Sequence, residues 1–226
     1  MASRVRRPAR VTNGRLLPGR HSTNPVRTPI PRSPTGRPDT VTAGWLERIG
    51  PDEGVPAEHG RLADLTVLAK PSSKEASADV EKRFASALFG SARPVLLAPE
   101  HGVAEAPRTV AVAWNGSAEC ARALLGALPL LENPDRQHVL TAATPRTRVE
   151  SGAALAEYLG WHGRLFEVHP IPREEEGPAL LARARELGAR LLVMGGDGRS
   201  RMRDRIFGGV TRHVPDHGDL PLLIAH

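Results

Sequence analysis

Short apolar runs alternate with amphipathic, helix-like stretches through the second half of this 226-residue chain, and this alternation limits the possible folds more than any other feature. We expect strands near 109–113, 138–143, 164–169, 190–194 and 221–225. We expect helices near 117–128, 150–161, 175–187 and 208–215. Apolar strands that alternate with helices predict an open, mostly parallel α/β sheet of five strands with helices on both faces.

Local signals support several of these boundaries. Ser117 and Ser151 stand where helix N-caps are expected, and Gly160 and Gly188 stand where C-caps are expected. The helix near 175–187 has an apolar stripe that we expect to face the core, made of Leu180, Leu181, Ala184 and Leu187.

An internal repeat organises the chain after residue 60. Ala63–Leu68 resembles Ala189–Met194, and Pro94–Ala98 resembles Pro221–Ala225 at nearly the same spacing. Between its two apolar runs the first copy has a helical pattern over 77–88, and upstream of residue 60 no further series of strands and helices is evident. We therefore expect a partial domain over 44–100, which ends in strand, helix and strand, and a complete domain over 107–226.

A glycine-rich stretch follows the apolar run at 191–193. A strand that leads through glycines into a helix start directs backbone N–H groups toward an anion, and nearby arginines such as Arg199 add positive charge. The stretch is not a Walker A loop, because no Gly-Lys-Ser/Thr closes it. It is not the dinucleotide fingerprint either, because Arg201 stands where a glycine is needed.

The spacing Gly195-x2-Gly198-x9-Gly208 resembles the phosphate loop of the universal stress protein family. Three further stretches follow the order that this family requires, at 110–117, 187–195 and 220–225. The resemblance covers about 107–226 and implies a Rossmann-like sheet with strand order 3-2-1-4-5. With the partial first copy, the chain is similar to a tandem universal stress protein whose first domain is truncated.

The resemblance also implies a ligand site at the carboxyl ends of the first and fourth strands, where the strand order reverses. The ligand it implies is an adenine nucleotide, ATP with Mg²⁺. Ala142, Ala143 and Met194 would flank the base. The nucleotide-binding residues so implied are Asn115, Met194, Gly195, Gly198, Arg199, Gly208, Gly209 and Val210.

Two positions depart from the nucleotide-binding members of the family. Asn115 stands where the first strand usually ends in Asp, and Gly209 stands where a Ser or Thr usually follows the third glycine. Each departure is expected to cost ~1 kcal/mol of binding free energy, or roughly five- to tenfold in affinity. The alternative is a domain of the same fold that acts as a dimeric interaction module, with a loop that holds no ligand.

The positive charge of the chain is concentrated at its N-terminus. Residues 1–43 hold nine Arg, one Asp and seven Pro, so they carry a net charge of +8, whereas the whole chain carries +6. This segment is expected to be a disordered tail, because it lacks the periodic apolar residues of a packed core. A nucleic-acid partner for this Arg-rich arm is a further alternative, but it is disfavoured because the remaining residues are slightly acidic.

The expected oligomeric state and cellular location of the protein depend on less specific features of the sequence. In the family the last strands of two domains pair, so we expect a homodimer or an intrachain pseudo-dimer through Pro94–Ala98 and Pro221–Ala225. The single Cys120 fits the reducing cytoplasm. No apolar run approaches the ~20 residues of a membrane span, so no membrane partner is expected.

Other candidate residues have simpler explanations. His213 and His217 are four residues apart, but Pro215 lies between them, and no metal site is expected there. Cys120 is expected to be a small buried group. Trp114 and Trp161 are expected in the core or in the wall of the crevice.

No pattern of residues indicates catalysis. Glu174, Glu175 and Glu176 suit the positive end of a helix dipole better than a metal. Neither Ser117 nor Ser200 has an evident His partner, and no Gly-x-Ser-x-Gly elbow is present. We expect a stress-response protein that is not an enzyme, with at most slow ATP hydrolysis.

Overall fold

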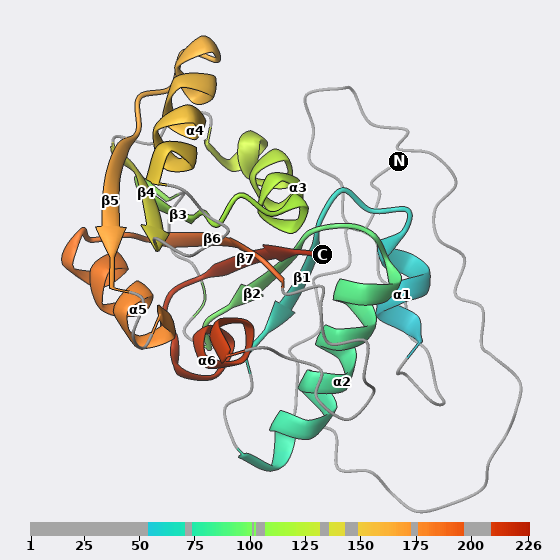
Figure 1. The fold of residues 1–226 in the computed structure, drawn as a ribbon. Coiled ribbons are helices and arrows are strands. Elements are labelled where there is room, and N and C mark those ends of the chain that lie inside the picture. Colours follow the sequence, from blue (N-terminus) through green and yellow to red (C-terminus); the bar gives the residue numbers. More distant parts are fainter. Residues whose placement is uncertain are drawn as a thin grey trace, which may run out of the picture. The chain divides into compact units, whose positions relative to one another are not determined.

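A seven-stranded sheet runs through the described part of the chain (Figure 1). The computed structural model describes residues 54–70, 74–100, 102, 107–131, 136–142, 149–172, 176–196 and 209–226. The strands are β1 Thr66–Ala69, β2 Val95–Ala98, β3 Thr109–Ala113, β4 Arg136–Ala142, β5 Glu167–Ile171, β6 Leu191–Gly195 and β7 Leu222–Ala225. They lie in the order β1-β2-β7-β6-β3-β4-β5.

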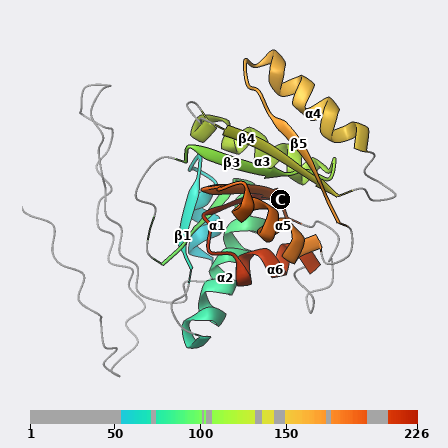
Figure 2. The same cartoon turned by 90° about the vertical axis from the view of Figure 1, so that its left-hand side faces the viewer.

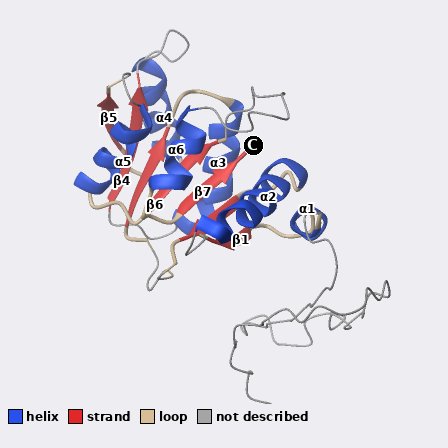
Figure 3. Ribbon diagram, turned by 90° about the horizontal axis from the view of Figure 1, so that it is seen from below, coloured by secondary structure: helices blue, strands red, loops and turns tan. Residues whose placement is uncertain are grey.

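Helices cover both faces of this sheet (Figure 2, Figure 3). They are α1 Val55–Gly60, α2 Lys74–Gly90, α3 Ala118–Ala127, α4 Val149–Trp161, α5 Glu176–Glu186 and α6 Gly209–His217, and the 3-10 turn η1 spans Leu128–Leu131. Buried side chains of α3, η1 and α4 pack on one face, and those of α2, α5 and α6 pack on the other. The α/β class predicted from the alternating pattern is therefore confirmed.

The segment predicted to be a complete copy, residues 107–226, has the predicted strand order. Strands β3, β4, β5, β6 and β7 are all parallel to their neighbours among these five. Read within this copy alone, the order β5-β4-β3-β6-β7 is 3-2-1-4-5. This agreement confirms the Rossmann-like arrangement and places the reversal of strand order between β3 and β6.

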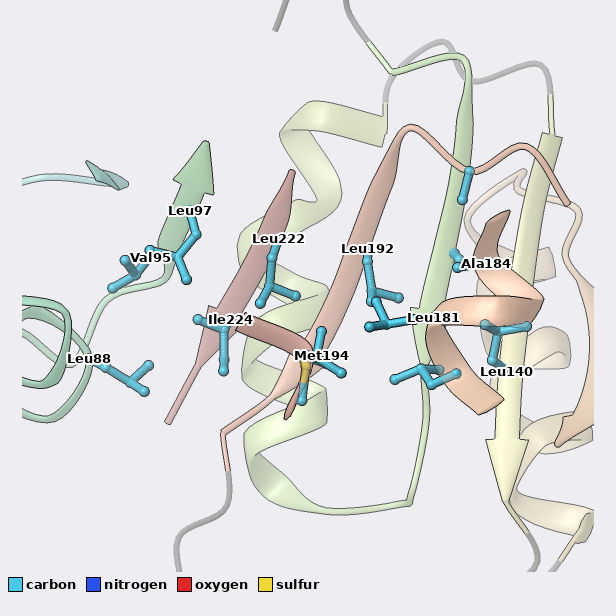
Figure 4. Close-up of a cluster of buried hydrophobic side chains, with 14 of the residues drawn as sticks. Leu88, Val95, Leu97, Leu140, Leu181, Ala184, Leu192, Met194, Leu222 and Ile224 are labelled. Atoms are coloured by element: carbon cyan, nitrogen blue, oxygen red, sulfur yellow. The ribbon is translucent and has the colours of Figure 1, made fainter. Parts of the chain in front are cut away.

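The partial copy adds its strands to the same sheet. Strands β1 and β2 pair in parallel, and β2 pairs antiparallel with β7, with Leu96 opposite Leu223. Side chains of both copies share one apolar cluster, in which Leu88 and Leu97 belong with Leu222 and Ile224 (Figure 4). Residues 51–226 accordingly form one compact unit, and the predicted tail over 1–43 lies outside the described residues.

Two of the predicted helix caps are confirmed. Ser117 is the N-cap of α3, and its Oγ accepts a hydrogen bond of 3.2 Å from the backbone N–H of Cys120. Gly188 has a φ of +67°, which a residue with a side chain rarely adopts, and it follows the last turn of α5. The buried stripe predicted for α5 is also confirmed, with Ala184 fully buried.

Two other predicted caps are wrong, both in α4. Ser151 lies inside the first turn, because the helix begins at Val149, and its Oγ accepts a hydrogen bond from the Trp114 indole instead. Gly160 lies inside the last turn, and Gly163, with a φ of +71°, makes the closing turn. Leu159 lies in this last turn, and its side chain is fully buried.

One short helix was not expected from the sequence. Helix α1 packs against the end of α2, so closely that a Cβ on Gly90 would lie 2.6 Å from the Cβ of Ala57.

None of the described helices combines the length and apolar character needed to cross a membrane.

The shared sheet predicts that the complete copy is not independent. A chain of residues 107–226 would lack β2, leaving the edge of β7 open, and would expose apolar surface that Phe84, Leu88 and Val95 now cover. Because each such side chain contributes ~1.5–3 kcal/mol when buried, we expect a free energy of unfolding lower by several kcal/mol, and self-association. Urea denaturation and light scattering measure both, with a chain of residues 51–226 as the control. A monomeric 107–226 chain as stable as this control would contradict the expectation.

Candidate functional site

The carboxyl ends of β3 and β6 meet where the strand order of the complete copy reverses. The two strands are adjacent and parallel, with Val110 opposite Leu191 and Val112 opposite Val193. The chain leaves β3 for α3 on one face of the sheet, and it leaves β6 for α6 on the other face. In open α/β sheets, connections that diverge in this way mark the usual position of a ligand site, beyond the carboxyl ends of the two strands.

Asn115 follows β3 and is held by the turn that begins α3. Its Oδ1 accepts a 3.0 Å hydrogen bond from the backbone N–H of Ser117 and lies 3.0 Å from Sγ of Cys120. The side chain is exposed at this edge of the sheet. Asn115 therefore lies where the sequence places it, but its acceptor atom Oδ1 already serves the turn.

Gly195, the first glycine of the predicted phosphate loop, has a packing role of its own. A Cβ at this position would lie 2.5 Å from the backbone nitrogen of Cys120 and 2.8 Å from the carbonyl carbon of Glu119. Only glycine lets the end of β6 approach the first turn of α3 this closely. This contact brings the two predicted loops together, and it also explains the glycine without a ligand.

Two neighbours of Gly195 are engaged within the fold. The backbone N–H of Gly196 donates a 2.7 Å hydrogen bond to the carbonyl of Ala225, beyond the end of the β6–β7 pairing. The side chain of Met194 is only 3% exposed and lies in the apolar cluster beside Leu222 and Ile224 (Figure 4). The side chain of Met194 is thus a core group at the end of the strand.

The start of α6 supplies backbone donors. Gly209 and Val210 are its first two residues, and the first N–H groups of a helix have no acceptor within the helix. Lys70 follows the carboxyl end of β1, and its Nζ donates a hydrogen bond to the carbonyl of Gly218, just after α6. Because β1 is parallel to β2 and β2 is antiparallel to β7, this contact places the end of α6 at the amino end of β7. The first turn of α6 therefore points toward the carboxyl edge of the sheet, where β3 and β6 end.

Several predicted site residues lie outside the described residues. They are Ala143, Gly198, Arg199 and Gly208. Of the predicted set, the described residues bring together Asn115 and Gly195 through the first turn of α3, with Met194 behind them in the core and Gly209 and Val210 in α6.

Comparison with known proteins identifies the fold. No protein-family model matches the chain, and no curated protein matches it. Among solved structures, a universal stress protein from Archaeoglobus fulgidus is 18% identical, with a TM-score of 0.60 over 75% of this chain and 64% of that one. A functionally unknown protein from Pseudomonas aeruginosa is 16% identical, with a TM-score of 0.53 over 79% of this chain and 68% of that one. A universal stress protein in complex with cAMP is 26% identical, with a TM-score of 0.45 over 54% of this chain and 98% of that one.

The fold defines the class of this protein. The sheet, its helical layers and its reversal point make the described chain a Rossmann-like α/β protein. More particularly, it has the universal stress protein fold, so the resemblance read from the sequence is confirmed at the level of the fold. The match spans less than two thirds of the Archaeoglobus fulgidus protein, at 64% of its length.

The structure also shows the burial of the cysteine, tryptophan and histidine residues that the sequence singled out. Cys120 is 4% exposed, as predicted for a small buried group. Trp114 is partly buried, but Trp161 is 84% exposed, so the prediction of a core position for it is wrong, because it lies on the solvent side of the last turn of α4. His213 and His217 stack with ring centroids 4.2 Å apart, and His217 Nδ1 lies 3.1 Å from the carbonyl oxygen of His213.

A second polar cluster, which the sequence analysis missed, lies on β4 and β5. His138 Nδ1 is 3.0 Å from His169 Nε2, and Glu167 Oε2 is 3.6 Å from each of these nitrogens. The pKa of His138 is lowered, first by burial and next by the nearby His169. The sequence contained one sign of this cluster, the alternation Glu167-Val-His169 on a strand. His138 could not be added from the sequence, because only the register of β4 against β5 places it opposite Glu167.

The packing role of Gly195 is testable without a ligand. Gly195→Ala is expected to lower the free energy of unfolding by ~1–3 kcal/mol, because its Cβ would meet backbone atoms that have little room to move. Gly196→Ala is the matched control, since its Cβ would meet nothing nearer than 3.4 Å. Urea denaturation of both variants measures the difference. Equal stability of the two would show that the contact with α3 does not require glycine.

The lowered pKa of His138 predicts a pH dependence of stability. The unfolded chain, with the ordinary pKa of 6.5, binds this proton more readily than the folded chain. The contribution of His138 to stability is therefore complete above about pH 6.5 and is lost as the pH falls from there toward the lowered pKa. His138→Asn is expected to make the free energy of unfolding less dependent on pH in this window, measured by denaturation at several pH values. The same slope as in the exposed His162→Asn control would contradict this assignment.

Proposed function

We propose that the chain acts as a universal stress protein that binds an adenine nucleotide, ATP with Mg²⁺, at the carboxyl ends of β3 and β6. The observation that carries this proposal is the reversal of strand order between β3 and β6, with α3 and α6 beginning on opposite faces beside it. On this proposal the protein signals by nucleotide occupancy in the cytoplasm and is not an enzyme.

The phosphates would lie against the start of α6. The N–H groups of Gly209 and Val210 belong to the first turn of that helix, where the helix dipole favours an anion. The sequence adds Gly198, Gly208 and Arg199 in the connection that leads to it. Mg²⁺, when bound, would share the phosphate charge with these donors.

The nucleoside would lie near the turn after β3. Asn115 is exposed there, and its Oδ1 accepts a hydrogen bond from the backbone N–H of Ser117 in the turn. A carboxylate at this position would have a second acceptor oxygen in place of the amide nitrogen and a full negative charge, which makes a stronger hydrogen bond to a ribose hydroxyl. We therefore propose weaker binding than in family members that have Asp here.

The second candidate function is that of an interaction module with the same fold and no bound nucleotide. The observation that favours it is that packing against α3 already explains Gly195, while β7 already takes the N–H of Gly196. The protein would then act as an interaction module whose glycine stretch only shapes the domain. We further propose that the antiparallel pairing of β2 with β7 replaces, within one chain, the pairing of last strands between two copies.

Isothermal titration of ATP and ADP with Mg²⁺ into the full chain tests the proposal. We expect saturable binding, its loss in Gly198→Glu, and a roughly tenfold gain in affinity in Asn115→Asp. Gly160→Glu is the matched control, because Gly160 is exposed on α4 with nothing within 4 Å of a Cβ, and it is expected to bind as the unmodified chain does.

Two other outcomes would redirect the assignment. The absence of binding up to millimolar nucleotide, in a folded chain, would contradict the nucleotide proposal and leave the interaction module. A chain that lacks residues 1–43 is expected to keep its nucleotide binding. Loss of polyanion binding on the same deletion would instead support the nucleic-acid role of the Arg-rich arm.

A further inference from the structure

Two histidines and a glutamate converge on one face of β4 and β5. His138 stands opposite Glu167 in the register of the two strands, and His169 stands opposite Leu140, two residues further along. Alternate residues of a strand share a face, so the three side chains project to the same side of the sheet. Arg183 of α5 reaches them from above that face.

The separations of their donor atoms match the edges of a metal tetrahedron. The two imidazole nitrogens are 3.0 Å apart, and Glu167 Oε2 lies 3.6 Å from each of them. Zinc bonds of ~2.0–2.1 Å to nitrogen and oxygen at tetrahedral angles separate neighbouring ligand atoms by ~3.3 Å. An ion at the centre of this triangle would need only small movements of the side chains.

We propose that His138 Nδ1, Glu167 Oε2 and His169 Nε2 form a binding site for one divalent transition-metal ion of the zinc class. Three protein ligands leave the fourth position to water, because Glu167 is exposed while the two histidines are largely covered. The site is independent of the proposed nucleotide site, since it involves β4 and β5 and not the ends of β3 and β6.

The environment of the histidines fits this chemistry. Metal ligation requires neutral imidazole, and burial lowers the pKa of His138, which favours that form. The two histidines come from adjacent strands of the sheet, so their backbones are fixed before an ion arrives. The carboxylate of Glu167 supplies negative charge beside two neutral ligands.

Arg183 acts as the competitor of the metal. Its Nη2 lies 3.1 Å from His169 Nδ1, and a guanidinium can only donate, so the neutral His169 ring carries its proton on Nε2. That proton occupies the position where a metal would bind. On metal binding the proton must move from Nε2 to Nδ1, which keeps the ring neutral, and Arg183 must release His169 because Nδ1 then carries a proton and can no longer accept. Arg183 retains an acceptor when it does so, because its Nη1 is 2.9 Å from Glu186 Oε2.

Titration of the full chain with Co²⁺, followed by displacement with Zn²⁺, tests the site. We expect the visible absorption of four-coordinate Co²⁺ with one ion per chain. We expect its loss in His169→Gln, an affinity at least roughly tenfold lower in Glu167→Gln, and a higher affinity in Arg183→Met. His217→Gln controls for the stacked His213–His217 pair of α6 and is expected to bind as the unmodified chain does.

The Glu167 variant keeps the test decisive if a histidine variant fails to fold, because the Glu167 side chain is 75% exposed. No Co²⁺ or Zn²⁺ binding up to millimolar metal at neutral pH would overturn the proposal. So would binding that survives both Glu167→Gln and His169→Gln, or binding that is lost in His217→Gln. Weaker binding in Arg183→Met would overturn the role of Arg183 as competitor.

Discussion

Strand β7 holds the described chain together. All four of its side chains are buried, with Leu223 and Ile224 fully so, because β7 has a neighbouring strand on each side and a helical layer on each face. It pairs in parallel with β6 of its own copy and antiparallel with β2 of the partial copy. Backbone hydrogen bonds on both edges and apolar contacts on both faces therefore converge on this one strand.

The candidate nucleotide site depends on the strands that β7 supports. Strand β6 lies between β7 and β3, so its end is fixed against the start of α3 at a distance that only Gly195 permits. The same glycine thus satisfies a packing constraint and stands in a spacing typical of a phosphate loop. Packing alone accounts for the first glycine, whereas a use of the N–H groups at the start of α6 as anion donors belongs to the nucleotide proposal.

In the histidine cluster of β4 and β5, burial and hydrogen bonding decide which ring nitrogens carry protons. An imidazole that is almost fully buried resists protonation, and a guanidinium beside its partner fixes where the remaining proton lies. The arrangement is stable as a hydrogen-bonded chain from Arg183 through His169 to His138. It also holds three metal-binding atoms close together, so proton and metal would compete for the same nitrogen.

Within the described part of 107–226, the sequence by itself determined the order of the strands and main helices, the parallel sheet and the helix cap at Ser117. These features follow from local periodicity and from hydrogen bonds between residues a few positions apart. The caps assigned to Ser151 and Gly160 were wrong because α4 extends from Val149 to Trp161, past both of these local signals.

Only the tertiary structure decided the antiparallel joint between β2 and β7, the packing reason for Gly195 and the meeting of His138 with His169. Each of these joins residues that are far apart in the chain, and the register of such pairs is set by how whole faces pack. A local pattern contains no information about which strand edge or helix start will become its neighbour.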